Sequence, residues 1–462
     1  MSDVELARDE LRAFEQSDDP RLTQLTEPVD PDPDYSQGIP VARDRRTDEL
    51  IYIQFDGETR VGFFAPSGKG KTTFGKALIS RLYDAGFKIF NGGDIKNDFQ
   101  SLDYKGGASS SLIKRMGLAD YEQPHRIPKK IFMPKFMVDA YEGKVPSYVE
   151  PFTLGFQDLS WTDLQFLLQP DSQAQKRTVK KLARQVTMER LADTDREIHG
   201  FALLRQKIME MELGKNLERV MLDTIDVLEA EQIVGNQHRE DPLQYLNEIG
   251  CPECFTTEFQ STYDNLWTCT NEDCDWKGEK ENRVSFAISL GLERWREFRH
   301  GDMHKIQFYA AVLLRQLKER AKAGQITPPI LGFWDEAHLL LPATGESLMT
   351  GPMQDLVDVA ARQIEMPIVL SSQQPNKIPH SDDADILAEL NHLFLGFDLD
   401  KKHWKAALDS MSLYRHYDAD KWRRKMNRLK KYDFLYVSPE HHDSVTDCPI
   451  VRSLAPLCSH PG

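Results

Sequence analysis

The chain has 462 residues and is acidic, with 58 Lys and Arg against 73 Asp and Glu and a formal net charge of −15. Hydrophobic residues make up 40% and charged residues 28%, which excludes a wholly disordered chain and an integral membrane protein. The longest apolar runs are far shorter than the ~20 residues of a membrane-spanning helix. An acidic chain cannot coat nucleic acid with its whole surface, although this does not exclude a local basic surface.

The N-terminal part carries much of the acidity. Residues 1–50 hold 14 acidic and 6 basic residues, and proline is frequent between residues 20 and 40. We therefore expect residues 1–48 to form a disordered arm. The N-terminus lacks the basic and apolar stretches of a secretory signal, which predicts a cytoplasmic protein.

Strand and helix patterns alternate in two parts of the chain. Apolar strands are expected over 50–55, 60–64, 87–90, 284–288, 330–334 and 368–371. Helices are expected over 74–83, 306–323 and 355–364. This alternation predicts an α/β fold with a mainly parallel sheet. Residues 105–248 are mixed in pattern, and one amphipathic helix is expected over 203–234.

Residues 65–72 carry the pattern A-x-x-x-x-G-K-T between a strand and a helix, which is the P-loop pattern with Ala for its first Gly. Glycines let backbone N–H groups wrap a β-phosphate at the start of a helix. Lys71 would neutralise β- and γ-phosphate oxygens, and the Thr72 hydroxyl would bind Mg²⁺. The alternative is a chance match in a loop, which the flanking strand and helix disfavour. The residues expected to bind ATP are Pro66, Ser67, Gly68, Lys69, Gly70, Lys71, Thr72 and Thr73.

Two carboxylates, Asp335 and Glu336, directly follow the apolar strand 330–334. Ligands bind at the carboxyl edge of open parallel sheets, where such a strand ends. We expect Asp335 to hold Mg²⁺ and Glu336 to polarise the attacking water. The alternative is an exposed acidic pair at the start of a helix.

Four segments, in this order, resemble the HerA/FtsK branch of P-loop ATPases, which includes conjugation ATPases and virus packaging ATPases. They are the P-loop, Asn91–Phe99, Asp335–His338 and Ser371–Pro375. The last segment is similar to the family's T-Q-R-P, from which Ser372 and Gln374 depart. The resemblance covers residues 50–100 and 284–400 and implies a RecA-like P-loop NTPase core.

The resemblance also implies roles for three single residues. Asp94 belongs to a segment that looks like the family's acidic-Lys motif and would lie beside the nucleotide. Gln373 would be a polar sensor of the γ-phosphate, with a solvated turn glutamine as the alternative. Arg362 would be the arginine finger that one subunit of a ring contributes to the γ-phosphate bound by its neighbour. The usual alternative for such a residue is a surface ion pair. Arg315 and Arg320 are the other finger candidates.

Four of the six cysteines have the spacing C-x2-C-x14-C-x4-C: Cys251, Cys254, Cys269 and Cys274. Two tight turns that each bring two thiolates are typical of a tetrahedral Zn²⁺ site, and disulfides are the weaker alternative in a cytoplasmic chain. We expect a structural zinc ribbon, which either only holds its insert together or also contacts DNA through Trp267, Trp276 and Lys277. Cys448 and Cys458 have no such spacing.

Residues 421–431 carry seven positive charges in eleven positions. This segment either contacts DNA phosphates or forms a solvated helix face or a subunit contact.

Six segments are predicted in all. They are the arm (1–48), the P-loop half of the ATPase core (49–104), a helical or mixed insertion (105–248), the zinc ribbon (249–280), the second half of the core (281–400), and a C-terminal basic segment with a final strand (401–462).

The predicted function is an ATP-hydrolysing ring motor that translocates double-stranded DNA during genome packaging, plasmid transfer or DNA processing. It would be a homo-hexamer that uses ATP, Mg²⁺ and Zn²⁺, with a nuclease, a relaxase or a capsid protein as partner. One alternative is an ATPase that energises a secretion or conjugation machine. The other is a nucleotide-dependent DNA-binding or scaffold protein without motor activity.

Overall fold

The computed structural model describes residues 35–94, 127, 129–139, 149–168, 170, 172–230, 232–235, 241–251, 254, 256, 259–261, 266–278, 284, 285, 287–291, 302–343, 347–381, 384–409, 419–438, 442 and 447–454.

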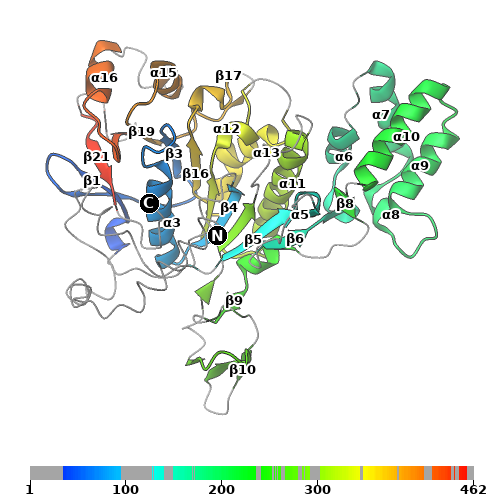
Figure 1. Ribbon diagram of the computed structural model, residues 1–462, viewed down its shortest axis with the longest axis horizontal. Helices are drawn as coiled ribbons and strands as arrows, with labels where there is room; N and C mark the ends of the chain where they lie inside the picture. Colours follow the sequence, from blue (N-terminus) through cyan, green and yellow to red (C-terminus); the bar gives the residue numbers. More distant parts are fainter. Residues whose placement is uncertain are drawn as a thin grey trace, which may run out of the picture.

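A twelve-stranded sheet runs through the described part of the chain (Figure 1). In sheet order its strands are β2 (Leu50–Ile53), β1 (Ile39–Asp44), β21 (Ile450–Ser453), β20 (Asp433–Val437), β19 (His392–Gly396), β3 (Arg60–Phe64), β16 (Ile368–Ser372), β15 (Ile330–Trp334), β4 (Lys88–Asp94), β14 (Ala287–Gly291), β5 (Lys129–Pro134) and β6 (Val149–Phe152). Neighbours are parallel from β19 to β6 and antiparallel from β2 to β19. The predicted α/β fold with a mainly parallel sheet is confirmed.

Helices cover both faces of the parallel part, because successive side chains of a buried strand point to opposite faces. On one face, Phe74 of α3 (Lys71–Asp84) packs edge-on against Phe63 of β3, with ring centroids 4.4 Å apart. Phe394 of β19 joins them at 4.7 Å from Phe74. On the other face, α11 (Asp302–Lys322) shares a buried cluster with Trp334 of β15. The helix after the P-loop is thus fixed to the sheet by aromatic packing.

The remaining helices and helical turns of the core are short. They are η1 (Tyr35–Gln37), α5 (Lys135–Asp139), η4 (Pro242–Leu246), α12 (Ala337–Leu340), α13 (Thr350–Asp355), the π-helical turn η7 (Leu356–Ala360), α14 (Ala361–Gln363), η8 (Pro375–Lys377), α15 (Lys401–Asp409) and α16 (Ala419–Met426). A small hairpin joins β17 (His380–Ser381) to β18 (Ala384–Asp385).

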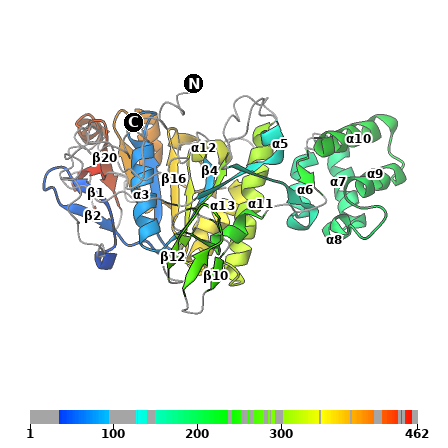
Figure 2. The ribbon, with the colours of Figure 1, turned by 60° about the horizontal axis from the view of Figure 1, so that its bottom comes forward.

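A group of helices stands beside the sheet, beyond β6 (Figures 1 and 2). It contains η3 (Phe156–Asp158), α6 (Trp161–Leu168), α7 (Gln173–Gln185), α8 (Met188–Ala192), α9 (Gly200–Glu210) and α10 (Lys215–Ala230), and it is entered and left through the paired strands β7 (Leu154–Gly155) and β8 (Val234–Gly235). The prediction of one helix over 203–234 is wrong. The chain turns between α9 and α10, where Glu212 has a left-handed φ of 50° and Gly214 follows.

The cysteine-rich insert projects from the sheet in Figure 1. Its three-stranded sheet consists of β10 (Phe259–Ser261), β11 (Trp267–Cys269) and β12 (Lys277–Gly278). The antiparallel pair β9 (Ile249–Gly250) and β13 (Val284–Ser285) connects it to the core.

Three of the predicted segments contribute strands to the sheet that the sequence analysis did not expect. Within the expected arm, residues 39–44 form β1, which pairs with both β2 and β21. Pro40 is tolerated there because the pairing with β21 begins at Ala42 and a register shift follows Pro40 on the other side. Within the expected helical or mixed insertion, β5 and β6 extend the parallel sheet. The C-terminal part contributes two strands, β20 and β21, rather than one.

None of the helices in the described ranges is long and apolar enough to cross a membrane.

A close contact between Gly92 of β4 and Trp334 of β15 shapes the strand that carries the acidic pair. Trp334 is 1% exposed, and a Cβ atom at residue 92 would lie 2.1 Å from its Nε1 atom. Only glycine therefore lets the indole ring lie against the backbone of the neighbouring strand.

We expect Gly92→Ala to lower the free energy of unfolding by about 1–3 kcal/mol, because the added methyl group overpacks the core. Urea denaturation would measure the change. Gly351→Ala is the control: its Cβ would enter open space in α13, so stability should be unchanged or slightly raised. Equal stability of the Gly92 and Gly351 variants would contradict this account.

Candidate functional site

The predicted nucleotide-binding segments meet at the carboxyl edge of three adjacent strands. β3 leads into the P-loop, β15 into Asp335 and β16 into Gln373, and the sheet order is β3-β16-β15. Neighbouring parallel strands end at the same edge of a sheet, so the side chains that follow them converge. Figure 1 shows α12 and β17, which follow β15 and β16, at this same end of the sheet.

The centre of the site is a buried cation between two buried carboxylates. Lys71 Nζ lies 2.6 Å from Asp335 Oδ1 and 3.4 Å from Glu336 Oε1. All three residues are at most 5% exposed. Burial alone would lower the pKa of Lys71, but the two carboxylates outweigh it and raise that pKa above its ordinary value. The Lys71 ammonium is therefore charged and holds both carboxylates.

Glu336 and Gln373 contact each other directly. Glu336 stands at the start of α12 with a left-handed φ of 46°, which turns its carboxylate toward the end of β16. The Gln373 side-chain amide donates to Glu336 Oε1, and its backbone N–H donates to Oε2 at 3.4 Å. The predicted water-polarising residue and the predicted sensor thus lie side by side.

Three polar residues that the sequence interpretation did not single out complete this network. Ser371 Oγ donates to Asp335 Oδ1 at 2.7 Å. Ser372 Oγ lies 2.9 Å from His338 Nδ1, which in turn is 3.6 Å from Glu336 Oε2. Ser371 and Ser372 end β16, and His338 lies in α12, three residues after Asp335. Their place within the segments Asp335–His338 and Ser371–Pro375 is the sequence feature that could have found them.

The P-loop backbone has the conformation that its glycines predict. Gly68 and Gly70 have left-handed φ values of 71° and 105°, and α3 begins at Lys71. The ring of Tyr432 covers Gly70, where a Cβ would lie 2.6 Å from its Cδ1 atom. The Tyr432 N–H also donates to the Lys69 carbonyl at 3.3 Å. A contact from the C-terminal part of the chain therefore supports the loop.

The remaining P-loop residues differ in exposure. Ser67 is exposed, Pro66 and Thr72 are half-buried, and Thr73 is buried. Thr72 lies in the first turn of α3, beside Lys71.

The residues predicted to bind Mg²⁺ are suited to that ion. Asp335 Oδ2 is buried, and it has no hydrogen-bond partner among the described residues. A carboxylate oxygen and a threonine hydroxyl are hard oxygen ligands of the kind that Mg²⁺ prefers.

Asp94 ends β4, which is the neighbour of β15, and it is fully buried. The rest of its motif, residues 95–99, lies outside the described residues.

Arg362 lies away from its own chain's P-loop. It belongs to α14, which precedes β16, so it stands near the amino edge of the strands. Its side chain is 59% exposed and its Nε atom lies 3.4 Å from Glu58. The two alternative fingers are held within the chain, Arg315 by Asp163 and Arg320 by Asp241. Of the three arginines, Arg362 is the most available to a neighbouring subunit.

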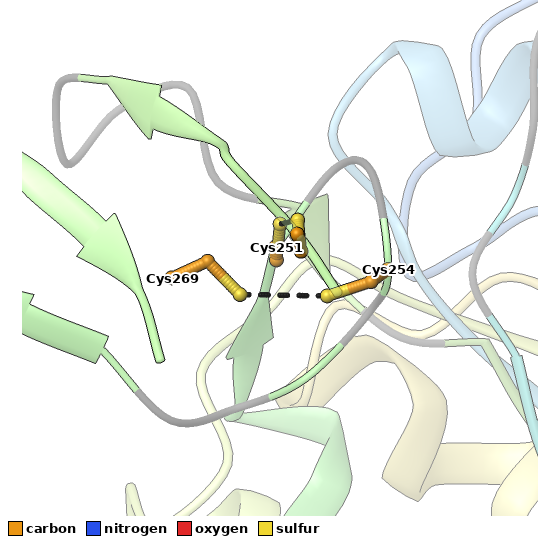
Figure 3. A group of neighbouring side chains, drawn as sticks. Cys251, Cys254 and Cys269 are labelled. Carbon is orange, nitrogen blue, oxygen red and sulfur yellow. Dashed lines mark hydrogen bonds between the residues drawn. The ribbon is translucent and has the colours of Figure 1, made fainter. Parts of the chain in front are cut away.

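The four spaced cysteines converge, as Figure 3 shows for three of them. All four Sγ atoms lie within 4.8 Å of one another. Cys251 and Cys274 are 3.7 Å apart, and Cys254 and Cys269 are 3.4 Å apart. Four thiolates bound tetrahedrally at ~2.3 Å from Zn²⁺ would be about 3.8 Å apart, so the cluster is compatible with this ion. Cys448 is buried elsewhere, and Cys458 lies outside the described residues.

The aromatic residues of the insert pack against one another. The rings of Trp267 and Trp276 lie 6.3 and 5.8 Å from the ring of Phe259. Lys277 is exposed beside them. This packing gives the two tryptophans a structural role that needs no bound DNA.

Two basic surfaces lie on helices. Residues 421–431 contain most of α16, which Trp422, fully buried, anchors to the core. The sequence interpretation missed the second surface, on α7, a helix that contains no acidic residue. Its exposed cations recur at the spacing of one helix face: Lys176, Arg177, Lys180, Lys181 and Arg184. Figure 1 shows α7 and α16 at opposite ends of the molecule.

No protein family model matches the sequence, and no curated protein matches it. Solved structures do match. The chain is similar to VirB4 of Thermoanaerobacter pseudethanolicus, with a TM-score of 0.51 and 11% identity over 90% of this chain and 96% of that chain.

Weaker matches have TM-scores below 0.5. The plasmid coupling protein TrwB, in complex with an ATP analogue, has a TM-score of 0.47 at 10% identity, with 88% of each chain covered. The genome packaging NTPase B204 from Sulfolobus turreted icosahedral virus 2 has 0.25 at 12% identity, with 37% of this chain and 68% of that chain covered. The likeness to VirB4 confirms, as a likeness of fold, the resemblance to HerA/FtsK-type P-loop ATPases that the sequence predicts.

We expect Lys71→Met to lower the free energy of unfolding by about 3–5 kcal/mol, because two buried carboxylates lose their cation. The loss should be largest near pH 8 and shrink toward pH 5. Without the lysine, the two buried carboxylates would take up protons more readily in the folded variant than in the unfolded chain. The stability of the variant therefore falls as pH rises. Urea denaturation across this pH range would measure it.

Lys69→Met is the control. Lys69 forms an ion pair with Asp398, whose side chain is 64% exposed, so its loss should cost less than about 1 kcal/mol. Equal losses for the two variants, or a Lys71→Met loss that grows toward acid pH, would contradict the buried network.

Proposed function

We propose that the chain is an ATP-hydrolysing motor that works as a homo-hexameric ring in the cytoplasm and translocates double-stranded DNA. The observation that carries the proposal is the group formed by the buried Lys71, Asp335 and Glu336 and the half-buried Gln373 at the end of three adjacent strands. A P-loop lysine, an acidic pair and a sensor are the parts that phosphoryl transfer to water requires.

Each residue would have a distinct task. The backbone of residues 66–70 would wrap the β-phosphate, and Lys71 would leave the carboxylates for the β- and γ-phosphate oxygens. Glu336 would orient and polarise the attacking water. Gln373 would hold the Glu336 carboxylate in place through its two hydrogen bonds. Asp335 and Thr72 would hold Mg²⁺, which neutralises charge on the phosphates.

The His338 side chain contacts the Glu336 carboxylate, and the Ser372 hydroxyl contacts His338. His338 lies between the Ser372 hydroxyl and the Glu336 carboxylate, at 2.9 and 3.6 Å. Because Glu336 is 1% exposed, such polar neighbours can hold its carboxylate in one orientation.

Two features favour DNA as the substrate that is moved. The surface of α7 and residues 421–431 concentrate positive charge on a chain of net charge −15, and phosphate backbones bind such clusters. Genome packaging, plasmid transfer and DNA processing would all use this activity, with a capsid protein, a relaxase or a nuclease as the partner.

The test is ATP hydrolysis by the purified chain with and without duplex DNA. We expect turnover that rises with DNA, and we expect Glu336→Gln to lower kcat about 100-fold or more while ATP still binds. Glu365→Gln, a change of an exposed carboxylate, is the matched control and should leave turnover unchanged.

The other outcomes separate the alternatives. ATP turnover that does not change when duplex DNA is added would favour an ATPase of a secretion or conjugation machine. No turnover at all would favour a nucleotide-dependent scaffold, and full turnover by Glu336→Gln would remove the proposed catalytic role.

The ring proposal predicts that Arg362 acts on the site of a neighbouring subunit. Arg362→Ala and Lys71→Ala proteins should each be inactive alone, and a mixture should regain part of the activity, because some interfaces then join an intact arginine to an intact P-loop. ATPase assays over a series of mixing ratios would measure this. Full turnover by Arg362→Ala alone would exclude the role.

We also propose that the four spaced cysteines bind one structural Zn²⁺. Hydrogen bonding favours one thiolate in the cluster: burial acts to raise the pKa of Cys254, but the backbone N–H of Thr256 and neighbouring thiols lower it to about 7, while burial and the contact with Cys254 raise the pKa of Cys269.

Metal analysis should find about one zinc per chain, and Cys274→Ser should lower the zinc content and destabilise the insert. Cys448→Ser, a change at a buried cysteine outside the cluster, should keep the zinc. Metal-free protein with an intact, protease-resistant insert would contradict the assignment.

A further inference from the structure

A pocket of about 320 Å³ lies next to the P-loop, among the described residues. The segment that follows β19 forms one wall, with Phe397 and Asp398. The other walls come from α15, with Trp404, and from α16 and the residue after it, with Arg423 and Asn427. Figure 1 shows α15 and α16 together at the end of the molecule toward which β19 and β3 run. The volume of the pocket lies at the lower end of the range for small-molecule sites.

Lys69 connects this pocket to the phosphate-binding loop. Its Nζ atom lies 3.1 Å from Asp398 Oδ2 and 4.7 Å from the centroid of the Phe397 ring. The backbone of Lys69 belongs to the loop that would wrap the phosphates, so the pocket wall and the loop are in direct contact.

The direction of the catalytic residues indicates what the pocket receives. β3 has two neighbours in the sheet, β16 on one side and β19 on the other. The acidic pair and Gln373 lie on the β16 side, so a γ-phosphate must point there. A triphosphate held at its β-phosphate then extends its α-phosphate and nucleoside toward β19, where the pocket lies.

We infer that this pocket binds the base and ribose of the nucleoside triphosphate, a statement that rests on the proposed ATPase function. Phe397 is half-buried and offers a ring on which a base can stack. The Asn427 amide offers both a donor and an acceptor to the edge of a base, and the Asp398 carboxylate can accept from ribose hydroxyls.

The inference changes the interpretation of the basic segment 421–431. Arg423 and Asn427 line the nucleoside pocket, so this part of the segment faces the nucleotide rather than DNA. The same segment leads to Tyr432, which covers Gly70 of the P-loop. One stretch of chain therefore both lines the pocket and covers the P-loop.

The first experiment compares two ligands, Mg-ATP and Mg-tripolyphosphate, by calorimetry with the full chain and no DNA. The wild-type chain should bind ATP at least tenfold more tightly than tripolyphosphate, because only ATP fills the pocket. Phe397→Ala should weaken ATP binding about tenfold and change tripolyphosphate binding less than twofold, since one aromatic stacking contact is lost.

Two further variants serve as controls. Phe397→Tyr keeps a ring and should restore the affinity for ATP. Tyr52→Ala removes a 36% exposed ring from β2, which is remote from β19 in the sheet, and should change neither affinity.

Failure of the pocket and failure of the proposed function give different results. If the wild-type chain binds both ligands equally, or if Phe397→Ala binds ATP as tightly as wild type, the pocket assignment is wrong while the P-loop assignment stands. If the wild-type chain binds neither ligand, the proposed function fails, and this inference fails with it.

A second measurement needs no variant that could misfold. Irradiation of the wild-type chain with 8-azido-ATP should label peptides that contain residues 397–404 or 423–427, and an excess of ATP should prevent the labelling. ATP-protected labelling confined to other peptides would overturn the inference.

Discussion

The structure depends on the neutralisation of two buried carboxylates by one buried ammonium group. Lys71 and Asp335 are 264 positions apart in the chain, yet their side chains meet at 2.6 Å. Neither charge could remain buried without the other, because an unpaired buried ion costs several kcal/mol. The contact therefore joins the strand and helix that flank the P-loop to the strand that carries the acidic pair, and the helical group and the cysteine-rich insert project outside this core. In the proposed nucleotide complex, ATP phosphates would take the place of the carboxylates beside Lys71, and Mg²⁺ would take the place of Lys71 beside Asp335.

Close contacts with glycine position this ion pair from two sides. Gly92 lets Trp334 pack against β4, which fixes the strand that ends at Asp335. Gly70 lets Tyr432 cover the P-loop, and Tyr432 directly follows the basic segment. A change at residues 421–431 can therefore reach the nucleotide through a short, packed path. Such a path is what a motor needs if a contact at its surface is to influence hydrolysis.

The sequence predicted the parts of the fold and site that depend on local patterns. The P-loop, Asp335, Glu336 and Gln373 each follow an apolar strand, so their meeting at one edge follows from parallel pairing. Strands β1, β5 and β6 were missed because long-range pairing, rather than local pattern, decides whether a short apolar run joins a sheet. His338 and Ser372 lie within the recognised segments, but only the contacts from Ser372 to His338 and from His338 to Glu336 give them a role. The basic face of α7 was missed because its cations are spread over a helix rather than contiguous.

The most direct measurement is an experimental structure of the chain with Mg²⁺ and a non-hydrolysable ATP analogue. The account predicts that Lys71 Nζ leaves Asp335 and contacts the β- and γ-phosphate oxygens. Mg²⁺ then takes the place of Lys71 beside Asp335. It also predicts that Glu336 and Gln373 remain together at the γ-phosphate. A structure in which the analogue is bound while Lys71 keeps its 2.6 Å contact with Asp335 would contradict the central claim.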